Sequence, residues 1–125
     1  MSLINFTLVI ACVLISTSAQ LVLKSGANKI QMALSSMTGQ ESLLIQTTAL
    51  ANPYILIGLF MYVFGAAGWI FVLTRVEVSS AYPLISLGFV FTLIFGHLLY
   101  GEAVTMSKIA GTIIIMIGCA LIARP

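Results

Sequence analysis

The fold class is decided by residues 54–73, which read YILIGLFMYVFGAAGWIFVL and include no charged side chain. A helix of about 20 apolar residues is long enough to cross the hydrocarbon core of a bilayer. Three further apolar runs occupy residues 3–23, 80–99 and 106–123. The sequence therefore predicts an all-α membrane protein, in which four transmembrane helices form a single domain over residues 1–125.

The composition excludes a water-soluble globule. Of the 125 residues, 61% are hydrophobic and only 6% are charged, whereas soluble domains carry roughly a quarter charged residues. The net charge of +2 is spread thinly, so no basic patch for nucleic acid is present. With one His, no Asp and three Glu, the chain offers neither a catalytic triad nor a carboxylate metal site. We therefore expect no enzyme activity, no cofactor and no bound metal.

The connection between the first two apolar runs is too long for a simple turn. Its residues 38–41, Thr-Gly-Gln-Glu, fit a capping box, which predicts a short interfacial helix over about residues 39–51. Asn52 is expected to cap the second transmembrane helix and Pro53 to begin it.

The remaining connections, near residues 75–79 and 101–107, are short. Short connections favour antiparallel neighbours, so we expect a compact four-helix bundle. Arg75 and Arg124 would lie on one membrane face and Lys24, Lys29 and Lys108 on the other.

That distribution of charge does not set the orientation of the chain in the membrane. The long, weakly charged connection slightly favours both chain ends in the cytoplasm. No Lys or Arg precedes Lys24, so we expect the first run to be retained rather than cleaved as a signal peptide.

The first apolar run carries a polar stripe. Ser16, Gln20 and Lys24 recur every four residues, which places them on one helix face leading from mid-membrane to the interface. A polar path that ends at a cation is suited to a phosphate headgroup. The alternative is that Lys24 only extends to the interface while Gln20 bonds a neighbouring helix, and the stripe alone does not decide between them.

Lys24 is expected at the same membrane face as His97 and Glu102, because the first and third spans run in the same direction. Glu102 could pair with Lys24 or with Lys108, as a plain interfacial salt bridge or as part of a proton relay. His97 is either a satisfied interfacial residue or a proton-dependent switch.

The third run combines a proline with small residues. Pro83 frees a backbone carbonyl near Ser79, which predicts a kink or a local binding site. Gly88, Thr92 and Gly96 follow at four-residue spacing and form a surface that another helix or a lipid chain can approach closely.

In the fourth run, Gly111 and Gly118 lie seven residues apart and on the same face, which also predicts helix packing. Cys12 and Cys119 lie in apolar runs near opposite ends of the sequence, without the spacing of a metal or redox pair. We interpret both cysteines as packing residues.

From residue 69 onward the chain resembles the second half of the small multidrug resistance family, within the drug/metabolite transporter superfamily. The matching landmarks are Ala-Tyr-Pro-Leu at 81–84, Gly-Glu at 101–102, and the pattern from Gly111 to Gly118-Cys119, which looks like the dimerisation helix of that family. The resemblance implies a dimer.

One branch of that family is more similar still. Ala-Gln-Leu at 19–21 followed by Lys24, and residues 81–84 followed by Ser-Leu at 86–87, resemble subunits that flip undecaprenyl-phosphate-linked 4-amino-4-deoxyarabinose across the bacterial inner membrane. The stretch 28–52 has no counterpart in this resemblance.

The chain departs from the drug exporters of the family at Ser16. Those exporters carry a membrane-embedded glutamate at this position, eight residues before the one that matches Lys24, where proton and drug compete. Without that carboxylate a cationic substrate loses its counter-charge. A lysine instead suits an anionic polyprenyl phosphate.

We therefore expect a multi-pass inner-membrane transporter that works as a homodimer or heterodimer and moves a polyprenyl-phosphate carrier or a sugar attached to it. Lys24 would hold the phosphate, and Glu102 would neutralise Lys24 as the headgroup leaves. The expected substrate-binding residues are Ser16, Gln20, Lys24, Tyr82, Pro83, Ser86, His97 and Glu102, and the expected dimer contacts are Gly111 and Gly118. The alternatives are an exporter of small amphipathic compounds and a non-transporting membrane subunit of a glycosyltransferase system.

Overall fold

The computed structural model describes residues 2–36 and 51–122. Every regular element in these two ranges is a helix. The helices are α1 (Leu3–Ser35), α3 (Pro53–Leu73), α4 (Val78–Ile85), α5 (Leu87–Tyr100) and α6 (Met106–Ile122). The expected interfacial helix at 39–51 with its capping box, and Arg124, lie outside the described residues apart from Ala51, which forms a turn.

Helix α1 is longer than the apolar run that predicted it. Ser2 caps its first turn by accepting a hydrogen bond from the Asn5 N–H, and the helix then continues to Ser35, well past residue 23. The extension is built largely from Ala, Lys, Gln, Met and Leu, which are good helix formers and tolerate an aqueous end. Residues 28–35, predicted to belong to the connection, are therefore helical.

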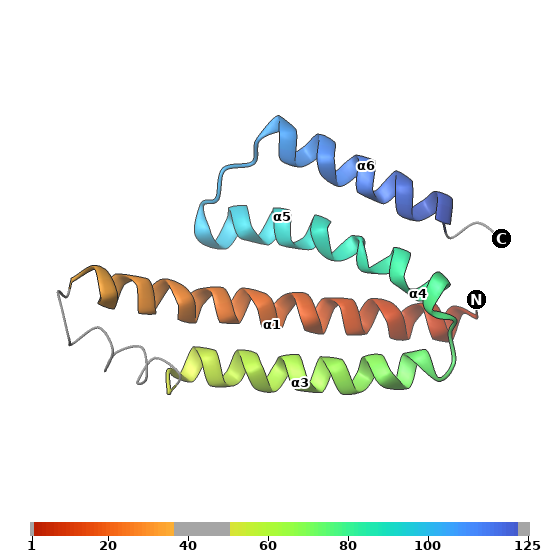
Figure 1. The fold of residues 1–125 in the computed structure, drawn as a ribbon, viewed down its shortest axis with the longest axis horizontal. Coiled ribbons are helices and arrows are strands. Elements are labelled where there is room, and N and C mark those ends of the chain that lie inside the picture. The colour runs from red at the N-terminus through yellow and green to blue at the C-terminus, as the bar shows by residue number, and fades with distance from the viewer. Residues whose placement is uncertain (1, 37–50, 123–125) are drawn as a thin grey trace.

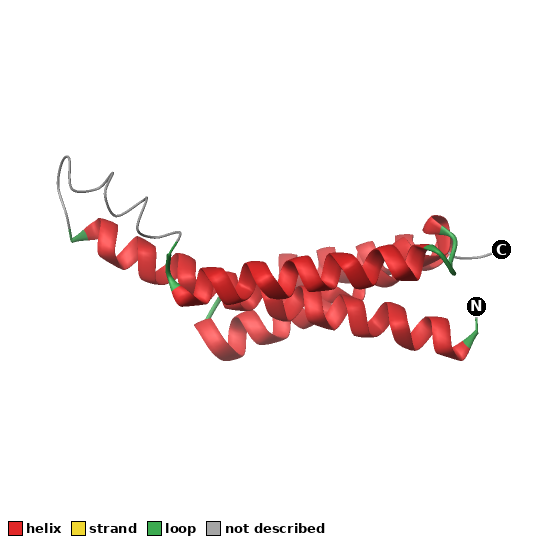
Figure 2. Ribbon diagram, turned by 90° about the horizontal axis from the view of Figure 1, so that it is seen from below, coloured by secondary structure: helices red, strands yellow, loops and turns green. Residues whose placement is uncertain are grey.

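Lys24 lies about one bilayer thickness along α1 from Leu3. Its 33 residues span about 50 Å, whereas a bilayer core is about 30 Å thick. Measured from Leu3, Lys24 lies about 32 Å along the helix. In Figures 1 and 2 the Ser35 end of α1 extends beyond the ends of the other helices.

The start of α3 follows the sequence prediction. The Asn52 side chain accepts a hydrogen bond from the Tyr54 N–H at 2.9 Å, and Pro53 is the first helical residue. Proline is favoured there because its missing N–H would have no partner in the helix. The predicted cap is thus confirmed.

The helices lie in the order α3, α1, α5, α6 across Figure 1. Helix α1 packs on α3 along one side and on α4 and α5 along the other, while α6 contacts α4 and α5. The short connection after α3 therefore does not place α5 directly against α3, because α1 lies between them. The successive apolar segments α1, α3, α4–α5 and α6 run antiparallel to one another, as expected, so α1 and α5 run in the same direction.

The third apolar run is divided into α4 and α5 at Ser86 (Figure 1). Pro83 lies inside α4, and the carbonyl of Pro83 accepts hydrogen bonds from both the N–H and the hydroxyl of Ser86. Proline and a serine that bonds back to the helix are both causes of helix bending. The predicted kink is therefore present, three residues after the proline.

The buried core is small and lies where the N-terminal half of α1 meets the end of α3 and the start of α4. Its members are Val9, Cys12, Val13, Val72, Val76 and Ala81. Many large apolar side chains on the other faces are exposed, for example Phe60 at 74% and Ile114 at 68%. Such exposure is expected of a protein whose outer surface contacts lipid.

Three helical stretches are long and apolar enough to cross a membrane: Leu3–Ser35, Pro53–Leu73 and Val78–Tyr100. Helix α6 is apolar but shorter. The described part of the chain is thus an all-helical protein with several apolar spans, in agreement with the fold class predicted from sequence.

Candidate functional site

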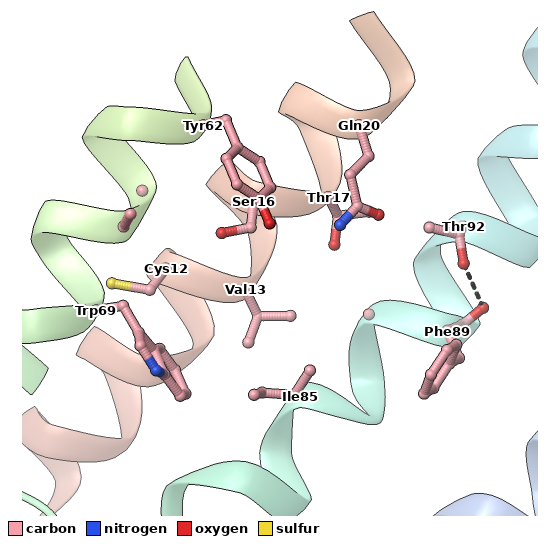
Figure 3. A pocket seen from close by; sticks show the side chains of 13 residues that line it. Cys12, Val13, Ser16, Thr17, Gln20, Tyr62, Trp69, Ile85, Phe89 and Thr92 are labelled. Atoms are coloured by element: carbon pink, nitrogen blue, oxygen red, sulfur yellow. Dashed lines mark hydrogen bonds between the residues drawn. The ribbon is translucent and has the colours of Figure 1, made fainter. Parts of the chain in front are cut away.

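A pocket of about 400 Å³ lies between α1, α3 and the α4–α5 segment (Figure 3). Ligand pockets in proteins commonly have volumes of about 300–1,000 Å³. The lining residues from α1 are Cys12, Val13, Ser16, Thr17 and Gln20; those from α3 are Tyr62, Gly65, Ala66 and Trp69; and those from the α4–α5 segment are Ile85, Gly88, Phe89 and Thr92. The two predicted pocket residues of the stripe, Ser16 and Gln20, thus line one cavity.

The pocket lining is polar but uncharged. Ser16, Thr17 and Gln20 contribute two hydroxyls and an amide from α1, and the hydroxyls of Tyr62 and Thr92 come from the facing helices. Thr92 donates its hydrogen to the carbonyl of Phe89. No hydrogen bond joins the amide of Gln20 to another described residue, and Gln20 is exposed, so its amide is available to a ligand.

Glycines allow the helices around the pocket to approach closely. A Cβ atom placed on Gly65 would lie 3.0 Å from the Ser16 Oγ, and one on Gly88 would lie 3.3 Å from the Thr17 Oγ1. The packing role predicted for Gly88 is thus confirmed. Larger residues at these positions would push α3 or α5 away from the polar face of α1.

A cluster of polar and charged side chains lies beyond the pocket, where α1 meets the end of α5. The Lys24 Nζ is 3.6 Å from the Glu102 Oε1, and the two side chains are 49% and 45% exposed. Of the two partners that the sequence allowed for Glu102, the structure places Lys24 beside it. Lys108 instead donates to the carbonyl of Ala103 at 2.8 Å.

The position of Glu102 follows from the way α5 ends. Gly101 has a φ of 64°, a left-handed conformation that favours glycine, and the Glu102 N–H returns to the carbonyl of Gly96. A Cβ on Gly96 would lie 3.1 Å from the Glu102 Oε2, so this glycine leaves room for the carboxylate. His97 donates from Nδ1 to the carbonyl of Glu102 at 2.8 Å, because a carbonyl can only accept.

A second link joins α1 to α5 beside the ion pair. The Tyr100 hydroxyl donates to the carbonyl of Leu21, and the hydroxyl of Ser25 donates to Tyr100. This link holds the end of α5 against α1 at the level of Lys24.

The pocket and the ion pair are adjacent along α1. Gln20 at the end of the pocket and Lys24 at the ion pair lie four residues apart on one helix face, about 6 Å along the axis. The structure therefore brings an uncharged pocket and a single accessible cation within one helical turn.

Tyr82, Pro83 and Ser86 do not line the pocket. The Tyr82 ring contacts the edge of Trp69, with centroids 6.0 Å apart, and Trp69 in turn lines the pocket. Pro83 and Ser86 are buried in the junction between α4 and α5. These three residues thus lie at the end of the pocket away from Lys24.

The profile of the EamA-like transporter family matches residues 8–124. The chain belongs to the EamA-like transporter family. Membership indicates a multi-pass membrane transporter rather than an enzyme, as the sequence predicted.

Curated relatives are flippase subunits. The chain is 36% identical over 75 residues to the protein named "Probable 4-amino-4-deoxy-L-arabinose-phosphoundecaprenol flippase subunit ArnE" of Pseudomonas paraeruginosa, an alignment that covers 60% of this chain and 65% of that protein. Two proteins named as the ArnF subunit of the same flippase are each 32% identical to this chain. The alignment with the Proteus mirabilis protein covers 92% of this chain and 88% of that protein. The alignment with the Enterobacter sp. protein covers 90% of this chain and 89% of that protein.

The chain spans 65% of the first of these relatives and most of the other two. The resemblance drawn from the sequence to the flippase-subunit branch is confirmed by these matches. No solved structure matches the chain.

Gly111 and Gly118 lie at open positions on α6. A Cβ placed on either glycine would meet nothing within 4 Å, and α6 contains no buried residue. Both glycines are partly covered, and an added Cβ would nevertheless have open space, so within the described residues no helix packs closely on either of them.

Sequence reasoning missed several lining residues. Tyr62 and Trp69 lie seven residues apart on α3, and their common face was a usable signal in an otherwise featureless apolar run. Thr17 adjoins Ser16 but points toward Gly88. Tyr100 gave no local signal, because its partner Leu21 contributes only a backbone carbonyl.

Proposed function

We propose that this chain is a subunit of a transporter that moves a polyprenyl-phosphate-linked sugar across the bacterial inner membrane. The observation that carries the proposal is the accessible Lys24, one helical turn beyond an uncharged polar pocket within an otherwise apolar bundle. The relatives are named as flippase subunits for a sugar linked to phosphoundecaprenol, which supports the same class of substrate.

Lys24 holds the phosphate in this proposal. An ion pair as exposed as Lys24–Glu102 contributes only about 0–1 kcal/mol, so a phosphate can take the place of the carboxylate at little cost. A phosphate offers several acceptor oxygens and a charge-assisted bond to the ammonium group. When the headgroup leaves, Glu102 returns to Lys24, and His97 positions the Glu102 backbone for this exchange.

Ser16 and Gln20 line the path of the headgroup below Lys24. Tyr82, Pro83 and Ser86 shape the opposite vestibule, through the contact of Tyr82 with Trp69 and through the kink between α4 and α5. The polyprenyl tail stays in lipid beside the exposed apolar faces of the helices.

We propose further that α6 also spans the membrane, which gives four transmembrane segments, and that residues 39–51 form an interfacial helix. A chain of 13.3 kDa encloses little space, so a second copy or a related subunit completes the transporter. The proposed contact between the two subunits is the face of Gly111 and Gly118, where an added Cβ would meet no described neighbour.

Reconstitution in liposomes tests the phosphate site. Lys24→Ala should reduce flipping of a polyprenyl-phosphate-linked sugar at least tenfold, because the phosphate loses its counter-charge at the membrane boundary. Lys29→Ala is the matched control: Lys29 lies on the same helix but rests over the Tyr54 ring, 4.0 Å from its centroid. Equal losses in both variants would reduce Lys24 to an ordinary interfacial lysine.

A drug-resistance assay tests whether the protein is instead an exporter of amphipathic compounds. Cells that express this protein should gain no resistance to quaternary ammonium compounds, since the pocket presents Ser16 where a counter-ion is needed. Robust resistance with Ser16 unchanged would favour the exporter of amphipathic compounds instead.

A further inference from the structure

The chemistry of the pocket lining allows a statement about the sugar itself. Three hydroxyl or amide side chains of α1 face two hydroxyl-bearing side chains across the cavity, and Trp69 and Phe89 provide apolar surface beside them (Figure 3). Hydroxyl and amide groups both donate and accept hydrogen bonds, as sugar hydroxyls do. The lining therefore complements an uncharged, hydroxyl-rich ring.

A cation in this pocket would find no counter-charge among the described residues of this chain. None of the thirteen lining residues is charged. Among the carboxylates in the described part of the chain, Glu102 is beside Lys24 and Glu77 is exposed before the start of α4. The rings of Tyr62 and Trp69 attract cations, but a ring face does not replace a carboxylate for a charge removed from water.

The spacing along α1 fits one sugar ring. Gln20 lies about 6 Å below Lys24, a distance comparable to the span of a single pyranose. With its phosphate at Lys24, a lipid-linked monosaccharide would place its ring beside Gln20 and its far hydroxyls near Ser16 and Thr17.

We infer that this pocket is a sugar subsite that selects a neutral sugar, with a hydroxyl rather than an ammonium group at the end that enters the cavity. The inference rests on the proposed function and adds the charge of the sugar to it. By this inference the chain differs in specificity from its relatives, which are named as carriers of an amino sugar.

A matched pair of lipids tests the inference. Both carry arabinose on the same polyprenyl phosphate, one with a hydroxyl at position 4 and the other with an amine. Trp69 is the only tryptophan of the chain and lines the pocket, so its fluorescence reports occupancy. The hydroxyl sugar should bind the purified protein at least tenfold more tightly and should change the Trp69 emission, whereas polyprenyl phosphate without a sugar should bind without that change.

A carboxylate added to the pocket should change the preference. Gln20→Glu keeps the shape of the side chain and supplies the missing counter-charge, so the ratio of the two affinities should fall at least fivefold toward the amine. Any loss at Lys24 cancels in this ratio, because both ligands carry the same phosphate. Gln31→Glu, exposed on the same helix beyond the pocket, should leave the ratio unchanged.

The outcomes separate the two proposals. Equal affinity for both lipids, or a preference of the unmodified protein for the amine, would overturn the neutral-sugar subsite and leave the transport proposal standing. A ratio that does not respond to Gln20→Glu would also overturn the subsite. Failure of both lipids to bind would overturn the proposed function and the subsite together.

Discussion

Gly58 and Gly65 on α3 have the same seven-residue spacing as Gly111 and Gly118 on α6, but the surroundings of the two pairs are opposite. A Cβ on Gly58 would lie 2.7 Å from Leu23 Cγ and 3.1 Å from the Leu23 backbone nitrogen. For both glycines of α6, such a Cβ would meet no described atom within 4 Å apart from the adjoining residues and backbone of α6 itself. The two helices occupy opposite sides of the molecule in Figure 1.

The comparison shows that two glycine pairs with the same spacing can differ in whether another helix packs closely on them. In a membrane, helices associate by close packing and hydrogen bonds, since lipid is as apolar as a leucine side chain. The α3 glycines are used inside the subunit, where they bring α3 against the polar face of α1. The α6 glycines meet no close neighbour within the described residues, which is why we propose them as the contact with a second chain.

The largest effect on stability is expected at Gly58 and Gly65, the inner pair of glycines. Gly58→Leu should destabilise the folded subunit by about 2 kcal/mol or more, because the new side chain meets the backbone of Leu23 as well as its flexible end. Unfolding by denaturant in mixed micelles measures this change. A Gly58→Leu protein as stable as the unmodified chain would mean that α3 and α1 are not packed as described.

Substitution at Gly111 or Gly118, the outer pair of glycines, should change the stability of the fold less but should affect assembly strongly. Gly118→Leu should leave the subunit folded, because the site is open and leucine favours helix by about 1 kcal/mol over glycine. It should nevertheless yield monomer, as measured by cross-linking in membranes and mass determination in detergent. Gly88→Leu, on the α5 face that meets α1, is the comparison variant. A dimer that survives Gly118→Leu would contradict the assignment of the interface to α6.

The hydrogen bonds that join α1 to α5 should also contribute more to stability than a hydrogen bond within α6. Tyr100→Phe removes the hydroxyl that joins the carbonyl of Leu21 to Ser25 across α1 and α5. The variant should lose about 1 kcal/mol of stability, the usual net contribution of an intramolecular hydrogen bond. An unchanged unfolding curve would show that this link does not hold the two helices together.

The smallest effect is expected on α6. The hydroxyl of Thr112 bonds only to the carbonyl of Lys108 in the same helix, and valine keeps the branched shape. Thr112→Val should therefore change stability by less than about 0.5 kcal/mol. A loss as large as that of Tyr100→Phe would show that the Thr112 hydroxyl contributes more than a bond within its own helix.

Local sequence signals predicted local structure well. The Asn52–Pro53 start of α3 and the kink after Pro83 depend on nearby backbone groups, so each could be inferred from a few residues. The stripe of Ser16 and Gln20 was also visible, because helical periodicity alone places them on one face.

Features that depend on packing between helices could not be predicted in the same way. The shared face of Tyr62 and Trp69 could be read from their spacing, but the spacing does not state that this face meets α1, so both were missed as lining residues. The choice of Lys24 over Lys108 beside Glu102 depends on the left-handed turn at Gly101, which directs the carboxylate back toward α1. The position of α1 between α3 and α5 has the same origin, because connection length limits distance but does not assign neighbours.

The central claim, that Lys24 holds the phosphate of the substrate, can be tested directly by protection of lysines. The protein is treated with an amine-acylating reagent, with and without a polyprenyl-phosphate-linked sugar, and modification of each lysine is measured by mass spectrometry. We predict that the ligand protects Lys24 at least fivefold and leaves Lys29 and Lys108 equally reactive in both samples. Protection of Lys29 or Lys108 in place of Lys24, or no protection of any lysine by a bound ligand, would contradict the account.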